Sequence, residues 1–417
     1  KAEKKIKSFG KSIKTEMRKI QYPDSKKMQV LLNEYQNIFS DHLSTLQKAW
    51  SPLRDQLRKY SLNPACNNIY PDNIDDIFIK TYAELTDMYL DYIIIQQDTK
   101  KRNYPQLHKS LKKVFHYSGE ENASTPAYQP QIADFFMQHS KELGISVCYY
   151  CETSFINTYG FSSIYKNFAE FLVDADILML KKFVCNSKDE PYSDFVINDI
   201  YNLCHAKDIN TVVDKFDNYR YFKNGNSKKS ERVIKKMRNH FDLDHFLPKS
   251  VCPLVALSFY NFVPSCSVCN EKLKRSNMIG ETDKARLLML SPTSSDYQLD
   301  KEIKIRIVYK SGVSTLRMQE HPDDFRLEFI PERNPYQEIV RVFRLDERYN
   351  FHKQIALKQH DLYQDFAPGH ISQLKHLFNG AKSYQEIENQ IFRNEYIEDS
   401  ARCFDKLKKD VKEQCKR

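Results

Sequence analysis

Two pairs of cysteines, each with two residues between its members, are the clearest chemical feature of this chain of 417 residues. The pairs are Cys148/Cys151 and Cys266/Cys269. Thiols at this spacing are typical of structural zinc sites, in which four thiolates close a tetrahedral shell around Zn²⁺. We therefore predict one structural Zn²⁺ held by these four side chains.

A second group of polar residues lies beside the cysteines and has the types needed to hydrolyse a phosphodiester. The segment 239–249 contains Asp244 and His245, alternates like a strand and is stopped by Pro248. Histidine can take a proton from water near neutral pH, so His245 is the candidate general base. Mg²⁺ or Mn²⁺ prefers oxygen ligands, which Asp244 and Asn270 can supply.

Basic residues flank this group. The net charge of +9 fits a polyanionic partner without requiring one. The side chains that we predict to contact nucleic-acid phosphates are Lys235, Lys236, Arg238, Lys272, Lys274 and Arg275. The alternative is that these side chains form an ordinary solvated surface.

The segments CYYCE, DLDHFLPKS, YNFVPSC and CSVCNEKLK resemble the HNH (ββα-metal) endonuclease family. In that family a cysteine knuckle, a DH strand, a central asparagine and a CxxCN helix follow one another. The resemblance implies that His245 is the general base and that Asp244 and Asn270 bind the catalytic metal. It also implies that Asn261 orients the loop and the histidine.

The resemblance covers about 145–152 and 239–278, a small part of the chain. It is closest to HNH effectors of bacterial antiphage systems, some of which work beside an ATPase subunit. It therefore implies a DNA substrate and a possible ATPase partner. The interval from Cys151 to Asp244 is longer than in the family, which leaves open that the first cysteine pair belongs to another site.

The elements that must position these residues are mostly helical by pattern. We expect an N-terminal helical domain over 1–120, with a helical stretch at 25–60 broken near Pro52. We expect the nuclease domain over 130–290, with a helical insertion at about 155–235. The predicted fold class is α+β and mostly helical, with a ββα-metal HNH core and a four-cysteine zinc knuckle embedded between helical regions.

The remaining region, 295–417, is expected to be a β-hairpin followed by helices. Alternation over 302–318, with the turn at Lys310-Ser311-Gly312, predicts the hairpin. We interpret segment 343–353, which mixes charged and aromatic residues, as an interdomain surface.

Composition favours the cytoplasm and no membrane partner. We find no run of roughly 18 apolar residues, the length that spans a bilayer. The segment KAEKKIKSFG lacks the apolar stretch of a secretory signal. Two functions remain in competition: a metal-dependent HNH endonuclease that cuts DNA as an effector in bacterial defence, and a zinc-stabilised nucleic-acid- or protein-binding module without catalysis. The intact Asp244-His245 pair favours the first, because a binding module needs no base.

Overall fold

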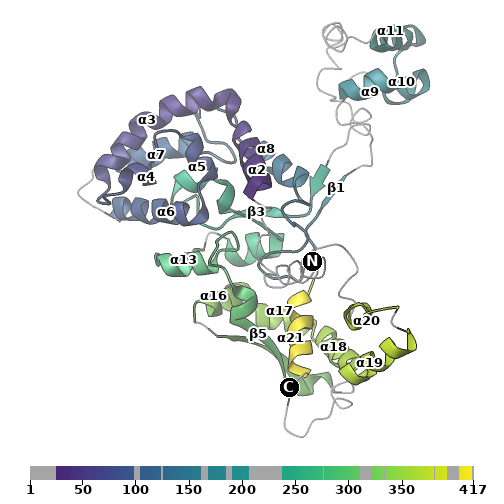
Figure 1. The fold of residues 1–417 in the computed structure, drawn as a ribbon. Coiled ribbons are helices and arrows are strands. Elements are labelled where there is room, and N and C mark those ends of the chain that lie inside the picture. The colour runs from purple at the N-terminus through teal and green to yellow at the C-terminus, as the bar shows by residue number, and fades with distance from the viewer. Residues whose placement is uncertain are drawn as a thin grey trace, which may run out of the picture. The chain divides into compact units, whose positions relative to one another are not determined.

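The structure, a computed structural model, describes residues 25–97, 104–123, 125–160, 168–184, 190–205, 237–275, 277–309, 321–332, 334–379, 381–391 and 403–415. Within these residues the fold is α+β and mostly helical, as predicted (Figure 1). The strands form two-stranded antiparallel sheets. The chain divides into two compact units: Lys1–Asn157 with His240–Arg417, and Thr158–Asn239. The three regions expected as separate domains, 1–120, 130–290 and 295–417, all contribute to the first unit.

The second unit overlaps the helical insertion expected at about 155–235. Its elements are β1 (Thr158–Gly160), α9 (Phe168–Asp174), α10 (Ile177–Phe183), α11 (Asp194–His205) and β2 (Met237–Asn239). β1 and β2 pair with each other and bring the ends of this unit together. The helices share a small apolar core that includes Phe171, Leu180 and Ile200. This unit therefore buries apolar surface of its own.

The N-terminal part of the first unit is a group of helices. They are α2 (Ser25–Asn37), α3 (Leu43–Tyr60), α4 (Cys66–Ile69), α5 (Asp75–Ile79), α6 (Tyr82–Gln97), α7 (Tyr104–Val114) and α8 (Gln129–Gln138). The break expected near Pro52 is wrong, because α3 continues through that residue and the chain turns earlier, at the short 3-10 helix η1 (Ser40–His42). Leu46, Trp50 and Leu57 are buried along α3, so packing of this face offsets the hydrogen bond that a proline removes.

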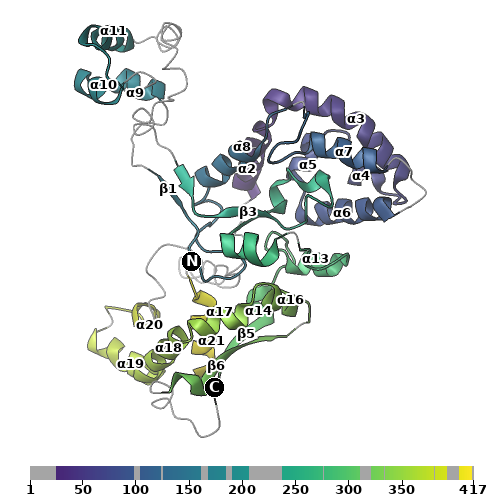
Figure 2. The ribbon, with the colours of Figure 1, turned by 180° about the vertical axis from the view of Figure 1, so that it is seen from behind.

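These helices pack around the segment that joins strands β3 (Asp242–His245) and β4 (Phe262–Ser265) (Figures 1 and 2). The joining segment contains the short 3-10 helices η3 (Pro253–Val255) and η4 (Phe259–Asn261). Tyr35 donates a hydrogen bond of 2.9 Å to the carbonyl of Leu257, and Ser258 donates one of 2.9 Å to the carbonyl of Ile77. The N-terminal helices thus fix the loop that follows His245.

β4 leads directly into η5 (Val268–Lys274), a π-helix, and then into α13 (Lys284–Leu290). The strand expected over 239–249 is shorter, at Asp242–His245, and the helix that the resemblance implies at the second cysteine pair begins at Val268. A π-helix makes i→i+5 hydrogen bonds and is often found at functional positions. Here the amide of Arg275 donates to the carbonyl of Asn270 at 2.8 Å.

The C-terminal part of the first unit is a two-stranded sheet with helices. Its elements are α14 (Leu299–Glu302), β5 (Ile303–Tyr309), β6 (Phe325–Pro331), α16 (Asn334–Val342), α17 (Leu345–Phe351), α18 (Gln354–Asp365), α19 (Pro368–Leu377), α20 (Tyr384–Ile391) and α21 (Asp405–Cys415). Asp410 and Gln414 of α21 hydrogen-bond to the backbone of β5 at Ile305 and Ile307. This helix therefore protects one strand edge of the sheet.

The hairpin expected within 302–318 is wrong in its second strand. β5 is the first strand, but its partner is β6, in the register Ile303↔Pro331. The expected turn at Lys310-Ser311-Gly312 lies outside the described residues. The buried Phe325, Leu327 and Phe329 alternate along β6, and Leu327 and Phe329 pair with the buried Ile307 and Ile305 of β5. Among the described residues, no helix has the length and apolar character required to cross a membrane.

Candidate metal centre and active site

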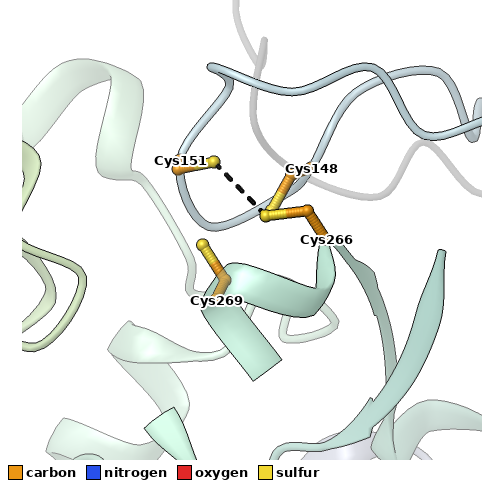
Figure 3. A group of neighbouring side chains, drawn as sticks. All are labelled: Cys148, Cys151, Cys266 and Cys269. Atoms are coloured by element: carbon orange, nitrogen blue, oxygen red, sulfur yellow. Dashed lines mark hydrogen bonds between the residues drawn. The ribbon is translucent and has the colours of Figure 1, made fainter. Parts of the chain in front are cut away.

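The four predicted cysteines come together in one buried cluster (Figure 3). Their sulfur atoms all lie within 4.8 Å of one another, and the Sγ atoms of Cys151 and Cys266 are 4.0 Å apart. Sulfurs about 2.3 Å from a tetrahedral Zn²⁺ would be separated by roughly 3.8 Å. The cluster is therefore close enough to bind a metal such as zinc, as predicted.

Two different local structures present the thiols. Cys148 and Cys151 lie on a tight loop, in which the amide of Glu152 donates to the carbonyl of Cys148 at 2.9 Å. Glu152 has a φ of 57°, in the left-handed region, so the chain reverses directly after Cys151. Cys266 directly follows β4, and Cys269 lies in the first turn of η5. Val147 and Phe155 form an isolated antiparallel bridge at the ends of this loop.

Burial and mutual hydrogen bonds shift the pKa values of the four thiols in opposite directions, and those of Cys148 and Cys269 are raised. Hydrogen bonding among the thiols lowers the pKa of Cys266 to about 6, first through Cys148, and lowers the pKa of Cys151 well below its usual value. Burial raises the pKa of Cys148. Thiolates bind metal and buried isolated thiolates are unfavourable, so a bound Zn²⁺ would compensate the negative charge that the cluster develops.

Asn261 holds the loop between the two strands. Its side chain is fully buried, and its Oδ1 accepts from the amide of Leu247 at 2.8 Å. Its Nδ2 donates to the carbonyls of Leu247, at 3.0 Å, and of Val255, at 2.9 Å. These three bonds connect both ends of the loop that follows His245, which is a positioning role of the kind the resemblance implies.

His245 lies at the end of β3 and is 8 % exposed. Its Nε2 lies 2.9 Å from the carbonyl oxygen of Ala256, which can only accept, so Nε2 carries the hydrogen. The rings of Tyr117 and Phe262 pack against it, with centroids 4.9 and 4.8 Å away. Burial, followed by the charge of Lys249, lowers the pKa of His245 to about 3. The imidazole is therefore neutral at pH 7.

The orientation of His245 leaves Nδ1 as the proton-accepting atom. Within the described part of the chain, no hydrogen bond to Nδ1 is present. Lys249 lies nearby, with its ammonium 4.4 Å from the centroid of the Tyr117 ring. Lys249 and Tyr117 were not among the residues predicted from the sequence. Lys249 lies within the DLDHFLPKS segment, whereas Tyr117 had no local motif.

Asp244 is 4 % exposed and its charge is already compensated. Tyr150 donates to Oδ2 at 2.5 Å, and Lys274 donates to Oδ1 at 3.0 Å. The same ammonium lies 3.0 Å from Oδ2 and donates to the carbonyl of His245 at 2.9 Å. Burial, followed by the charge of Asp244, raises the pKa of Tyr150 well above its usual value, so its hydroxyl remains a donor.

Asn270 is directed at a neighbouring carboxylate. Burial raises the pKa of Asp242, and the nearby amide side chain of Asn270 opposes this by favouring the charged carboxylate. The Oδ2 atom of Asp242 is buried without a hydrogen-bond partner. Asp242 and Asp244 are two residues apart in β3, so their side chains lie on the same face of the strand.

The expected Mg²⁺ ligands do not fit that ion in this arrangement. Mg²⁺ requires an octahedral shell of oxygens, several of them water. Both oxygens of Asp244 already accept from Tyr150 or Lys274, and a divalent cation there would have to displace the Lys274 ammonium. This arrangement of side chains therefore supports no chemical step through a catalytic metal.

The predicted phosphate-contact residues fall into four groups. Lys272 and Arg275 are exposed. Arg275 directly follows η5 and has a positive φ of 52°. Lys274 is 1 % exposed, so its ammonium serves Asp244 rather than the surface. Lys235 and Lys236 lie outside the described residues. Arg238 lies in β2, where its backbone pairs with Tyr159.

Comparison with known proteins adds no assignment to this geometry. No family model, no curated protein and no solved structure matches the chain.

Proposed function

We propose that this protein is an HNH-type endonuclease that hydrolyses phosphodiester bonds of DNA. The observation that carries the proposal is the arrangement of His245: Nε2 is held by the carbonyl of Ala256, and Nδ1 is left to accept a proton. The ββα-metal core stays a prediction, supported by the order β3, β4, η5 and by the four-cysteine cluster.

In the proposed reaction a water molecule attacks phosphorus and gives its proton to Nδ1 of His245. The bond from phosphorus to the departing oxygen breaks, and that oxygen is released as a hydroxyl after protonation from solvent. Asn261 holds the loop that supplies the Ala256 carbonyl, and so keeps the imidazole in one tautomer. Lys249 adds positive charge beside His245, which suits the approach of a phosphate.

The predicted requirement for Mg²⁺ or Mn²⁺ is the second part of the proposal. When bound, a divalent cation would neutralise charge on the phosphate. Asp242, Asp244 and Asn270 supply oxygen atoms in this part of the protein, and loading at Asp244 requires that Lys274 leave it. Whether cleavage needs a divalent ion is decided by comparing Mg²⁺, Mn²⁺ and EDTA.

The test compares plasmid nicking by the purified wild-type protein with nicking by the His245→Ala variant. General-base catalysis contributes about 10²- to 10⁴-fold, so we expect the variant to lose at least a hundredfold in rate. His240→Ala is the matched control, because His240 is an exposed histidine that precedes β3, and we expect it to cut normally. Zinc content and circular dichroism establish that each variant is folded. Wild-type cutting by folded His245→Ala would contradict the proposed base.

The rival function is a zinc-stabilised nucleic-acid-binding module without catalysis. The ion pair between Asp244 and Lys274 favours it, because a carboxylate compensated by lysine needs no metal. The burial of His245 favours it as well. This rival predicts retarded DNA in a gel-shift experiment and no product with Mg²⁺ or Mn²⁺. Cleavage that depends on His245 would exclude it.

The resemblance also implies a defence role and a partner such as an ATPase subunit, and both remain predictions. Affinity purification from the native host, followed by nicking assays with and without any recovered ATPase, tests them. Full activity of a lone monomer would count against a required partner.

A further inference from the structure

A guanidinium from a distant part of the sequence contacts the four-cysteine cluster. Arg348, on α17, donates from Nη1 to Sγ of Cys269 at 3.1 Å and from Nη2 to Sγ of Cys151 at 3.2 Å. Nη2 also donates to Oγ1 of Thr153 at 2.8 Å. The two sulfurs belong to different CxxC pairs, so one side chain bridges both halves of the cluster.

The chemistry of arginine suits this position. Four thiolates and one Zn²⁺ carry a net charge of about −2, which is unfavourable in a buried site. A guanidinium is always charged and offers several N–H donors in a planar fork, so it can serve two acceptors at once. Lysine offers a point charge and lacks this bridging geometry.

Further contacts fix the same loop to the C-terminal region. Tyr349 donates to the carbonyl of Cys151 at 2.8 Å. The amide of Phe404 donates to the carbonyl of Glu152 at 3.0 Å, and the amide of Lys406 donates to its carboxylate at 3.2 Å. Arg348 is therefore part of an ordered contact between α17, the start of α21 and the cysteine loop.

We infer that Arg348 is a positioning residue of the metal centre, which bridges Cys151 and Cys269 and slows release of the bound zinc. Outer-shell partners of metal ligands typically change affinity by about 10- to 100-fold when removed. Because Asn270 directly follows Cys269, the same contact connects the C-terminal region to the proposed active site. The inference concerns metal retention and does not depend on nuclease activity.

The test measures zinc transfer from the full-length protein to an excess of a chromogenic chelator. For Arg348→Met we expect release to be roughly tenfold to a hundredfold faster than in the wild type. Arg348→Lys keeps the charge without the bridge, so an intermediate rate is expected. Arg341→Met is the matched control, because Arg341 is exposed on the neighbouring helix α16, and its rate should be unchanged.

A second readout is the absorption spectrum of the Co²⁺-substituted protein. N–H donors stabilise sulfur lone pairs, so their loss in Arg348→Met should move the thiolate-to-cobalt charge-transfer bands to longer wavelength. An unchanged release rate and spectrum in folded Arg348→Met would overturn the inference. If that variant does not fold, Arg348→Lys decides: faster release supports the bridge, and wild-type release together with a wild-type spectrum contradicts it.

Discussion

The sulfur atoms of the four-cysteine cluster face one another, whereas the carboxylate of Asp244 already faces the ammonium of Lys274. The thiols have Arg348 at their edge, and their sulfurs remain gathered around a common centre. The carboxylate of Asp244 has Lys274 and Tyr150 on its oxygens. Both sites were predicted from the sequence to bind metal. The difference shows that residue type identifies a possible ligand, and the surrounding charges decide whether it is available.

The largest expected effect comes from breaking the cysteine cluster. Cys269→Ser should lose stoichiometric zinc and at least about 4 kcal/mol of unfolding free energy, because structural zinc contributes about 10–16 kcal/mol in small zinc-finger peptides. Zinc analysis and chemical denaturation measure this. Cys66→Ser, at a partly exposed thiol, is the control and should retain both properties. Full zinc content in Cys269→Ser would show that this thiol is not a ligand.

The second prediction addresses Asp244. Lys274→Met leaves a buried carboxylate without its partner and should cost about 3–5 kcal/mol in chemical denaturation. The double variant Asp244→Asn/Lys274→Met removes both charges and should recover part of this loss. Lys272→Met, at an exposed position of the same helical segment, should stay within about 0.5 kcal/mol of the wild type. An effect of equal size at both lysines would argue against a specific ion pair.

Adding Mn²⁺ to Lys274→Met tests whether Asp244 can bind a divalent cation once the lysine is removed. A ligand at a hundred times its dissociation constant stabilises the folded state by about 2.7 kcal/mol. If Lys274 occupies the place of a divalent cation, Mn²⁺ should stabilise Lys274→Met and leave the double variant with Asp244→Asn unchanged. Equal stabilisation of both variants would place the Mn²⁺ site elsewhere.

The smallest effect concerns pH. His245 has a folded-state pKa of about 3, below the value of about 6.5 expected in the unfolded chain. The unfolded state therefore binds the proton first. The free energy of unfolding is highest above pH 6.5 and falls as the pH decreases toward 3. Between pH 6.5 and 5 the loss should be about 1.7 kcal/mol. Gln does not titrate in this range. Over the same interval the free energy of unfolding of His245→Gln should therefore fall less than that of the wild type, and the difference should equal this loss.

Denaturation at matched pH values measures the difference between wild type and His245→Gln. Subtraction removes the contributions of carboxylates and of the cysteine cluster, which respond to acid in both proteins. Parallel curves would mean that the imidazole is accessible to protons in the folded state.

The sequence by itself determined the features that depend on local pattern and residue type. Amphipathic spacing predicted a mostly helical fold, and the two CxxC pairs predicted the cluster that the structure contains. The alternation around Asp244 predicted a strand at β3. These inferences succeed because helical and strand periodicity, and the affinity of thiolates for Zn²⁺, are properties of short segments.

Only the tertiary structure decided which distant residues meet. Lys274 belongs to a basic segment whose composition is typical of an exposed surface, yet the π-helix η5 buries its ammonium against Asp244. Arg348 has no motif, and segment 343–353, interpreted as an interdomain surface, brings it to the cysteines within one compact unit. The pairing of β5 with β6 likewise follows from burial on both strands. Long-range partners depend on packing and charge compensation across the fold, which local periodicity does not encode.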